Sequence, residues 1–360
     1  LSLSLLHSFQ SRLFPMDLVS TILNKNTSNL HLQPIDSSRW IEKMDHFYVA
    51  FLLLSCLFTT FVVTLSLLHL YHVLRFISNE RIQADLYYLV FMFPVTALCG
   101  VIGMFIPRAA TFLYSCALVY QMLCLFVTIS LLFNIFGGRK ELSEHLRATE
   151  TQINFRVPPL CCFSCLPSIE ATERNVRRVE WMVFQSPLLR LVLEAANVVV
   201  FLELNHRQHL WFLFSQLLGL ISMCVAFYGC YVLVPTTSEE VRKYRFVHIF
   251  RAVDVAQCLY TIQKFCFDFA ATIDIIRGDD LLSPSAKAQF WTSFMLTWEM
   301  LFMSCLLTYL LRPSKTQLFD KYHLRKGSEA IVTYTNPNNN NNVDESKEEE
   351  IRHFDALTAR

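Results

Sequence analysis

Long apolar stretches separated by short polar ones dominate the sequence. A membrane core of roughly 30 Å needs about 20 mostly apolar residues in a helix. Seven stretches meet that length: residues 47–74, 86–106, 110–136, 182–202, 210–234, 247–275 and 290–311. The pattern therefore predicts an all-α integral membrane protein, with a bundle of seven transmembrane helices in residues 47–311.

The composition agrees with this class of protein. Of the 360 residues, 53% are hydrophobic and only 17% are charged, which is rare in a soluble domain. The formal net charge of +1 gives no electrostatic reason to expect nucleic-acid binding. The sequence holds no nucleophile elbow, phosphate-binding loop, HExxH motif or dinucleotide fingerprint, so we expect neither an enzyme nor a cofactor.

Lysine and arginine are distributed unevenly among the connecting loops, which predicts an orientation in the membrane. The basic residues follow the third, fifth and seventh stretches: Arg139, Lys140, Arg147, Arg156, Arg174, Arg177, Arg178, Arg242, Lys243, Arg245, Arg312, Lys315, Lys321, Arg325 and Lys326. The loops after the second, fourth and sixth stretches hold only Arg108, Arg207, Arg277 and Lys287. We therefore expect the basic loops and the C-terminus in the cytosol and the N-terminus outside.

The segments that flank the bundle have separate expected roles. Residues 1–46 are expected to be extracellular, and Asn26 begins an Asn-Thr-Ser acceptor for N-glycosylation. The sequence opens on Leu1 with Met16 as an alternative start, and its first residues are not typical of a cleaved signal peptide. Residues 312–360 are expected to form a cytosolic tail, largely disordered from about residue 336, where it is Asn-rich and then acidic.

Polar residues of the sixth stretch share one helical face. Their spacings of three or four residues bring them together: Asp254, Gln257, Thr261, Lys264 and Asp268, with Arg251 at the edge. A single lysine or aspartate near the middle of a spanning helix costs roughly 2.5–3.5 kcal/mol. Lys264 and Asp268, four residues apart, can neutralise each other, and we expect this pair to face a functional cavity. We expect Arg251 and Asp254 to form a second pair, either in that site or at the cytosolic edge of the membrane.

Two other apolar stretches also contain charged residues. Arg190, Glu194 and Asn197 fall on one face of the fourth stretch, and Glu299 adds a carboxylate to the seventh. Two interpretations stay open. These residues form a polar network that holds the helices together, or they converge on a path for polar or amphipathic solutes. On the second interpretation they are transport-path candidates together with the polar face of residues 247–275.

A cysteine cluster lies in the loop 137–181, within the sequence PPLCCFSCLP. Its members are Cys161, Cys162 and Cys165. A zinc site would need a fourth ligand, but His145 is distant and no second Cys-x-x-Cys follows, so no metal is expected. Thiols beside a membrane are candidates for S-palmitoylation.

The seven stretches, this cysteine cluster and the sequence YRFVHIFRAVDVAQCLYTIQKF resemble the organic solute transporter subunit alpha family over residues 47–323. The resemblance implies facilitative transport of amphipathic organic anions or lipids, such as bile acids and steroid conjugates. It also implies a small single-span beta subunit, a plasma-membrane location with endomembranes during trafficking, and lipidation of the three cysteines. Phe163 and Ser164 interrupt the cysteine run that is often unbroken in the family.

Two other functions are weighed against transport. A seven-span receptor fits the number of stretches, but FNIFGGRKE after the third stretch lacks the acidic-Arg-aromatic switch, and the seventh stretch lacks an Asn-Pro turn. A non-transporting membrane organiser is compatible with the cysteine cluster, the long basic loop and the tail.

Overall fold

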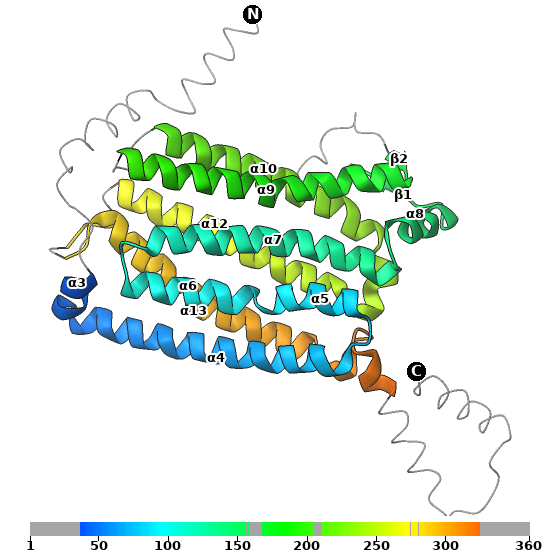
Figure 1. Ribbon diagram of the computed structural model, residues 1–360, viewed down its shortest axis with the longest axis horizontal. Coiled ribbons are helices and arrows are strands. Elements are labelled where there is room, and N and C mark those ends of the chain that lie inside the picture. Colours follow the sequence, from blue (N-terminus) through cyan, green and yellow to red (C-terminus); the bar gives the residue numbers. More distant parts are fainter. Residues whose placement is uncertain are drawn as a thin grey trace, which may run out of the picture.

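The computed structural model describes residues 37–155, 157, 168–204, 210–273, 275–279 and 281–324. In these residues long helices run side by side (Figure 1). The helices that cross the whole bundle are α4 (His46–Phe76), α7 (Ala110–Phe136), α9 (Glu173–Leu204), α10 (Leu210–Thr236), α12 (Phe246–Thr272) and α13 (Pro284–Leu310). One further pass is made by α5 (Glu80–Val90) followed by α6 (Met92–Phe105).

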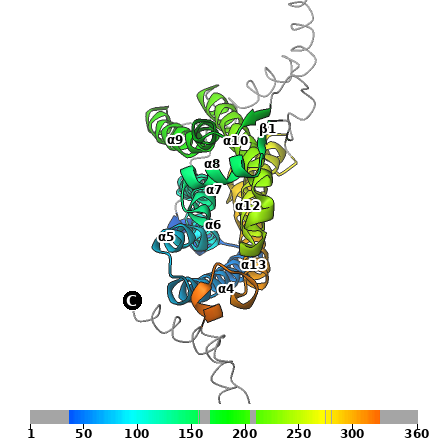
Figure 2. The same ribbon diagram turned by 90° about the vertical axis from the view of Figure 1, so that its right-hand side faces the viewer.

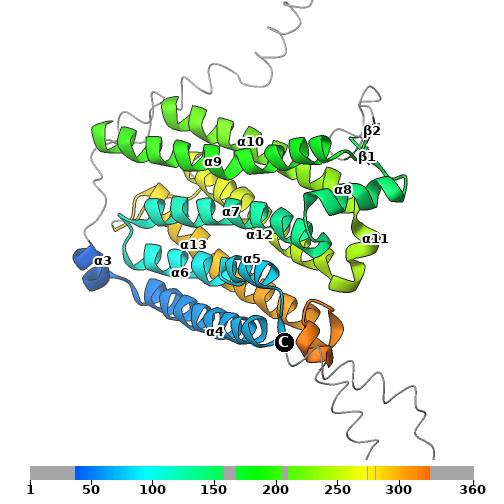
Figure 3. The same cartoon turned by 45° about the vertical axis from the view of Figure 1, so that its right-hand side comes forward.

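Viewed along their axes, the helices stand in two columns (Figure 2). One column contains α9, α7 and α5–α6, the other contains α10, α12 and α13, and α4 closes the far side. α9 packs chiefly on α10, whereas α7 contacts both α9 and α12. The α9–α10 pair therefore forms an outer layer that reaches the rest of the bundle mainly through α7 (Figure 3).

Successive connections alternate between the two ends of the bundle (Figure 1). The short helix α3 (Ser37–Lys43), the α6–α7 loop and the α12–α13 loop lie at one end. The other end carries the α4–α5 loop, α8 (Arg139–Ala148) and α11 (Ser238–Val241). Among the described residues, six helical segments are long and apolar enough to span a membrane, and α12, with its polar face, is not one of them.

The second pass is divided, although the sequence predicts one continuous helix over residues 86–106. α5 ends at Val90 and α6 begins at Met92. Pro94 explains the break, because its ring lacks an N–H and clashes with the carbonyl four residues earlier, that of Val90. Three helices also begin earlier than expected: α5 at Glu80 rather than 86, α9 at Glu173 rather than 182, and α13 at Pro284 rather than 290. α12 ends at Thr272 rather than 275.

The loop after α7 contains a two-stranded ribbon, a small departure from the all-α expectation. Strand β1 (Gln152–Asn154) pairs antiparallel with β2 (Ser168–Glu170). Ile153 of β1 is fully buried, and Tyr228 of α10 donates a hydrogen bond of 2.6 Å to the carbonyl of Phe155. The ribbon is thereby fixed to the end of α10. The three cysteines of the cluster between the strands lie outside the described residues, as does Asn26.

Trp40 fixes α3 to the opposite end of the bundle. Its indole is fully buried, donates to the carbonyl of Met104 at 3.0 Å and packs edge-on against Tyr48 and Phe290. A short helix gains little stability on its own. Side-chain packing of this kind therefore determines where α3 lies.

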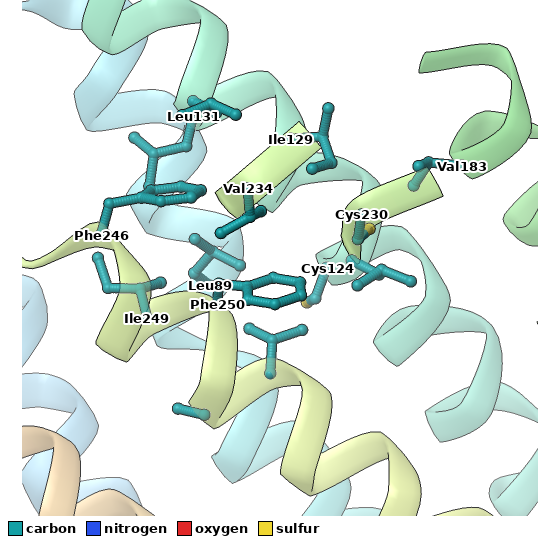
Figure 4. Packing of buried hydrophobic residues seen from close by; sticks show 14 of the residues in the cluster. Leu89, Cys124, Ile129, Leu131, Val183, Cys230, Val234, Phe246, Ile249 and Phe250 are labelled. Atoms are coloured by element: carbon teal, nitrogen blue, oxygen red, sulfur yellow. The ribbon is translucent and has the colours of Figure 1, made fainter. Parts of the chain in front are cut away.

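The end of the bundle that carries α8 has an apolar core (Figure 4). Buried side chains from α5, α7, α9, α10 and α12 meet there: Leu89, Cys124, Ile129, Leu131, Val183, Cys230, Val234, Phe246, Ile249 and Phe250. Toward the other end, charged and hydroxyl-bearing side chains enter the space between α7, α9 and α12.

Candidate functional site

Lys264 and Asp268 form the ion pair that their spacing predicts. Nζ of Lys264 lies 2.5 Å from Oδ1 of Asp268 on the next turn of α12. The lysine side chain is 16% exposed and the aspartate side chain 38% exposed. Because α12 ends at Thr272, Asp268 stands about one turn from the end of the helix. The carboxylate is therefore the more accessible member of the pair.

A second ion pair lies on α9. Nη2 of Arg190 is 3.0 Å from Oε1 of Glu194, and both side chains are largely shielded, at 15% and 13% exposure. The other carboxylate oxygen of Glu194 accepts hydrogen bonds from Ser115 at 2.7 Å and from Asn197 at 3.4 Å. Asn197 in turn accepts from the indole of Trp211 on α10. Both oxygens of this shielded carboxylate are thus hydrogen-bonded, as a charge removed from water requires.

Helix α7 connects the two pairs. Nζ of Lys264 lies over the ring of Tyr114, 5.5 Å from its centroid, and the next residue, Ser115, donates to Glu194. Tyr114 stacks on Tyr260 of α12, with centroids 4.5 Å apart and planes inclined by 12°. We call this group, Tyr114, Ser115, Arg190, Glu194, Tyr260, Lys264 and Asp268, the charged cluster.

The contribution of α7 to the charged cluster has no signal in the sequence. Tyr114 and Ser115 lie in a stretch without charges, where tyrosine and serine are unremarkable. Their spacing carries no signal either, because their partners come from other helices. Only the packing of α7 between α9 and α12 reveals their role.

The other residues on the polar face of α12 contact α7 and α10 outside the charged cluster. Asp254 is buried and accepts a hydrogen bond from the hydroxyl of Tyr231 on α10. Gln257 is fully buried and donates to the backbone carbonyl of Gln121 on α7. Thr261 is half-buried against α10. These contacts join α12 to its neighbours and are consistent with the structural interpretation of polar residues as connections between helices.

The expected pair of Arg251 and Asp254 is not formed. Arg251 is exposed, and in the described part of the chain no ion pair joins it to Asp254. Residues three apart are turned by about 60° around a helix, so one can face out while the other faces in. The aspartate faces α10 and Tyr231, and the arginine faces away from the bundle.

Glu299 is also separate from the charged cluster. It lies on α13, and its Oε1 accepts a hydrogen bond of 2.7 Å from Nε2 of Gln263 on α12. Of the ten transport-path candidates, the structure brings together Lys264, Asp268, Arg190, Glu194 and Asn197. It places Arg251, Asp254, Gln257, Thr261 and Glu299 in other surroundings.

The charged cluster has no net formal charge. Arg190 and Lys264 are balanced by Glu194 and Asp268. An anion that displaced one carboxylate from its cation would add one negative charge, so the displaced carboxylate would have to reach water. The stacked rings of Tyr114 and Tyr260 offer apolar faces beside the cation. Within the described ranges, no three His, Cys, Asp or Glu side chains are grouped to hold a metal ion.

Long apolar helices, two of which carry a largely shielded ion pair, define an all-α, multi-pass membrane protein. Residues 51–316 match the family model described as "Organic solute transporter Ostalpha". The chain belongs to this organic solute transporter alpha family, which is a family of membrane transporters rather than of enzymes.

Curated relatives support the same assignment. The chain is 49% identical over 308 residues to organic solute transporter alpha-like protein 1 of Caenorhabditis elegans, covering 85% of this chain and 80% of that protein. It is 32% identical to alpha-like protein 3 of the same organism, covering 89% and 90%. It is 30% identical over 110 residues to organic solute transporter subunit alpha of Danio rerio, covering 30% and 32%. No solved structure matches the chain.

Proposed function

We propose that this chain carries amphipathic organic anions, such as steroid conjugates and bile-acid-like molecules, across the membrane down their gradient. The observation that carries the proposal is the Lys264–Asp268 pair, with its partly exposed carboxylate, beside the stacked rings of Tyr114 and Tyr260. A sulfate or carboxylate group can replace Asp268 at Lys264. The tyrosine faces can then hold the apolar body of the solute.

The two ion pairs have different roles in this proposal. Glu194 is held by Arg190, Ser115 and Asn197, and separating a buried pair is strongly unfavourable. We therefore assign the α9 pair to positioning α7 and its tyrosine. Asp268 is more exposed and lies near the helix end, so its carboxylate can turn to water when an anion takes its place.

The apolar core at the α8 end serves as the barrier. A charged head that moves from Lys264 toward the α8 end first passes the level of Gln257 and Asp254. It then meets the buried side chains of Phe250 and Val234, which offer no hydrogen bonds. Moving a charge through such a region is costly. Transport therefore requires the helices around this core to separate, and the gradient of the solute supplies the direction.

We propose seven membrane spans, with the N-terminus outside and the C-terminus in the cytosol. The alternation of connections supports this, as does the basic character of the α8 end, where Arg139, Arg178 and Lys243 are found. α12 serves as a span because α7 and α10 cover much of its polar face.

We further propose a small single-span beta subunit as partner and a plasma-membrane location, with passage through endomembranes during trafficking. The name "subunit alpha" of the Danio rerio relative supports the existence of a partner. Palmitoylation of Cys161, Cys162 and Cys165 and glycosylation of Asn26 belong to the same proposal. These four residues lie outside the described part of the chain.

Uptake of a labelled steroid sulfate tests the proposal in cells that express the chain with its partner. The variant Lys264→Gln, Asp268→Asn removes both charges with little change in volume. The matched control is Lys140→Gln, Glu144→Gln, an exposed pair on α8 with the same order and spacing. We expect uptake to fall at equal surface level in the first variant only. Unchanged uptake in that variant contradicts the role of the pair, and no uptake by the wild type favours a membrane organiser.

A further inference from the structure

Gln263 and Glu299 form an isolated polar contact in the middle of the bundle. Nε2 of Gln263 donates to Oε1 of Glu299 at 2.7 Å, joining α12 to α13. Glu299 stands 15 residues after the first residue of α13, Pro284, and 11 residues before the last, Leu310. At about 1.5 Å per residue, it lies close to the centre of a membrane core of about 30 Å.

Two oxygens of this contact have no hydrogen-bond partner among the residues that the structure describes. Oε1 of Gln263 and Oε2 of Glu299 are both buried and without a hydrogen bond. They belong to the same two planar groups that the Nε2···Oε1 bond already joins. If the carboxyl group is ionised, both oxygens are acceptors and neither can satisfy the other. An unsatisfied buried acceptor costs about 1–3 kcal/mol, and more when it is charged.

A proton on Oε2 of Glu299 would supply the missing donor, because the acid O–H can donate to Oε1 of Gln263 while Nε2 of Gln263 donates to Oε1 of Glu299. Exchanging the amide oxygen and nitrogen of Gln263 leaves the requirement unchanged. The amide oxygen would then lie 2.7 Å from Oε1 of Glu299, where two acceptors need a proton between them. We propose that Glu299 is a proton-binding site inside the membrane and shares its proton with Gln263.

No charged neighbour opposes this assignment in the described residues. The helices packed against α13 are α4, α6 and α12. Within these described helices, Glu299 forms no ion pair with any of the titratable side chains, which are His46, Tyr48, Cys56, His69, Tyr71, His72 and Arg75 on α4, Cys99 on α6, and His248, Arg251, Asp254, Cys258, Tyr260, Lys264, Cys266 and Asp268 on α12. His69 is bound to Thr308, and Lys264 is paired with Asp268. Within the described residues, the hydrogen bond from Gln263 is the polar side-chain contact that this carboxyl group makes.

The site has a direct connection to the charged cluster, because Gln263 immediately precedes Lys264 on α12. Glu299 takes its proton from water. When the proton returns to water, it leaves a carboxylate opposite the Gln263 oxygen. Release therefore weakens the contact between α12 and α13. This inference concerns proton occupancy and stands whether or not the charged cluster carries a solute.

Infrared spectroscopy of the purified full chain with its partner tests the inference. A protonated carboxyl group gives a C=O band that an ionised carboxylate lacks. We expect such a band at pH 7 in the wild type and its loss in Glu299→Gln, where the amide keeps two hydrogen bonds to Gln263. The control Glu144→Gln, an exposed side chain on α8, should leave the band intact.

A second variant identifies the partner of the proton. In Gln263→Leu the Glu299 C=O loses its N–H donor, so its band should move to higher frequency. Identical bands in the wild type and Glu299→Gln would overturn the inference. An unshifted Glu299 band in Gln263→Leu would overturn the shared hydrogen bonds.

Discussion

The guanidinium of Arg190 on α9 occupies the space that a side chain at Gly219 on α10 would need. A Cβ at Gly219 would lie well inside van der Waals contact with Nη1 of Arg190. Glycine thus allows α10 to approach α9 at the level of the Arg190–Glu194 pair. The absence of one side chain on α10 therefore contributes to the position of the charged cluster.

Gly219→Ala should disturb transport through this contact. The added methyl group displaces the Arg190 head from Glu194, and we expect lower steroid sulfate uptake at equal surface level. Gly100→Ala is the matched control, because its Cβ would meet the nearest atom, the Ser293 carbonyl, at 3.5 Å, an ordinary contact. That substitution should keep uptake and improve helix stability by roughly 0.5–1 kcal/mol. Equal uptake by both variants would refute the proposed role of Gly219.

Glu194→Ala should destabilise the fold more than removal of the whole pair. The single change leaves Arg190 shielded from water without its carboxylate, which costs about 3–5 kcal/mol for buried pairs. The double variant Arg190→Met, Glu194→Leu restores apolar packing. Thermal stability in detergent measures both. A double variant less stable than Glu194→Ala would show that the pair itself contributes net stability.

Asp279 should make the loop before α13 sensitive to acid. Its carboxylate accepts hydrogen bonds from Lys287 at 2.8 Å and from Tyr48 at 2.6 Å. Both contacts lower the pKa of Asp279, and the contact with Lys287 has the larger effect. A carboxyl group whose pKa is lowered by folding stabilises the folded state. This contribution is fully present above the pKa of the unfolded chain, about 3.9, and is lost as pH falls through the pKa of the folded chain. The effect is small because Asp279 is largely exposed.

Comparison with Asp279→Asn measures this contribution. The wild type should be more stable than the variant at about pH 7, and the difference should shrink progressively as pH falls below about 3.9. Glu42→Gln on α3, also exposed, provides the control. A stability difference that does not change as pH falls would contradict the prediction.

Patterns within a single helix could be predicted from the sequence. The spacing of four residues predicts both the Lys264–Asp268 and the Arg190–Glu194 ion pairs, and both are confirmed. Apolar length predicts the helical passes to within a few residues at most ends. Pro94, whose effect on the second pass follows from its missing N–H, was available as a signal and was overlooked.

Contacts between helices could not be predicted in this way. Asp254 was expected to pair with Arg251 but faces Tyr231, because the position of α10 is set by the packing of the whole bundle. The same limit applies to Tyr114, which has no charge and gains its role only from Lys264 on another helix. The spacing of residues in the sequence predicts which side chains share one face of a helix. The packing of the helices determines which side chains of other helices that face contacts.

The most direct test compares the binding of a steroid sulfate with that of the same steroid without the sulfate. The protein is the purified complex of this chain with its partner, as wild type and as Lys264→Gln. A hydrogen bond to a charged group contributes about 1.5–3 kcal/mol, so the variant should bind the sulfate about tenfold more weakly or worse. Its affinity for the uncharged steroid should not change. Equal weakening of both ligands, or of neither, would contradict the proposal that Lys264 receives the anionic head.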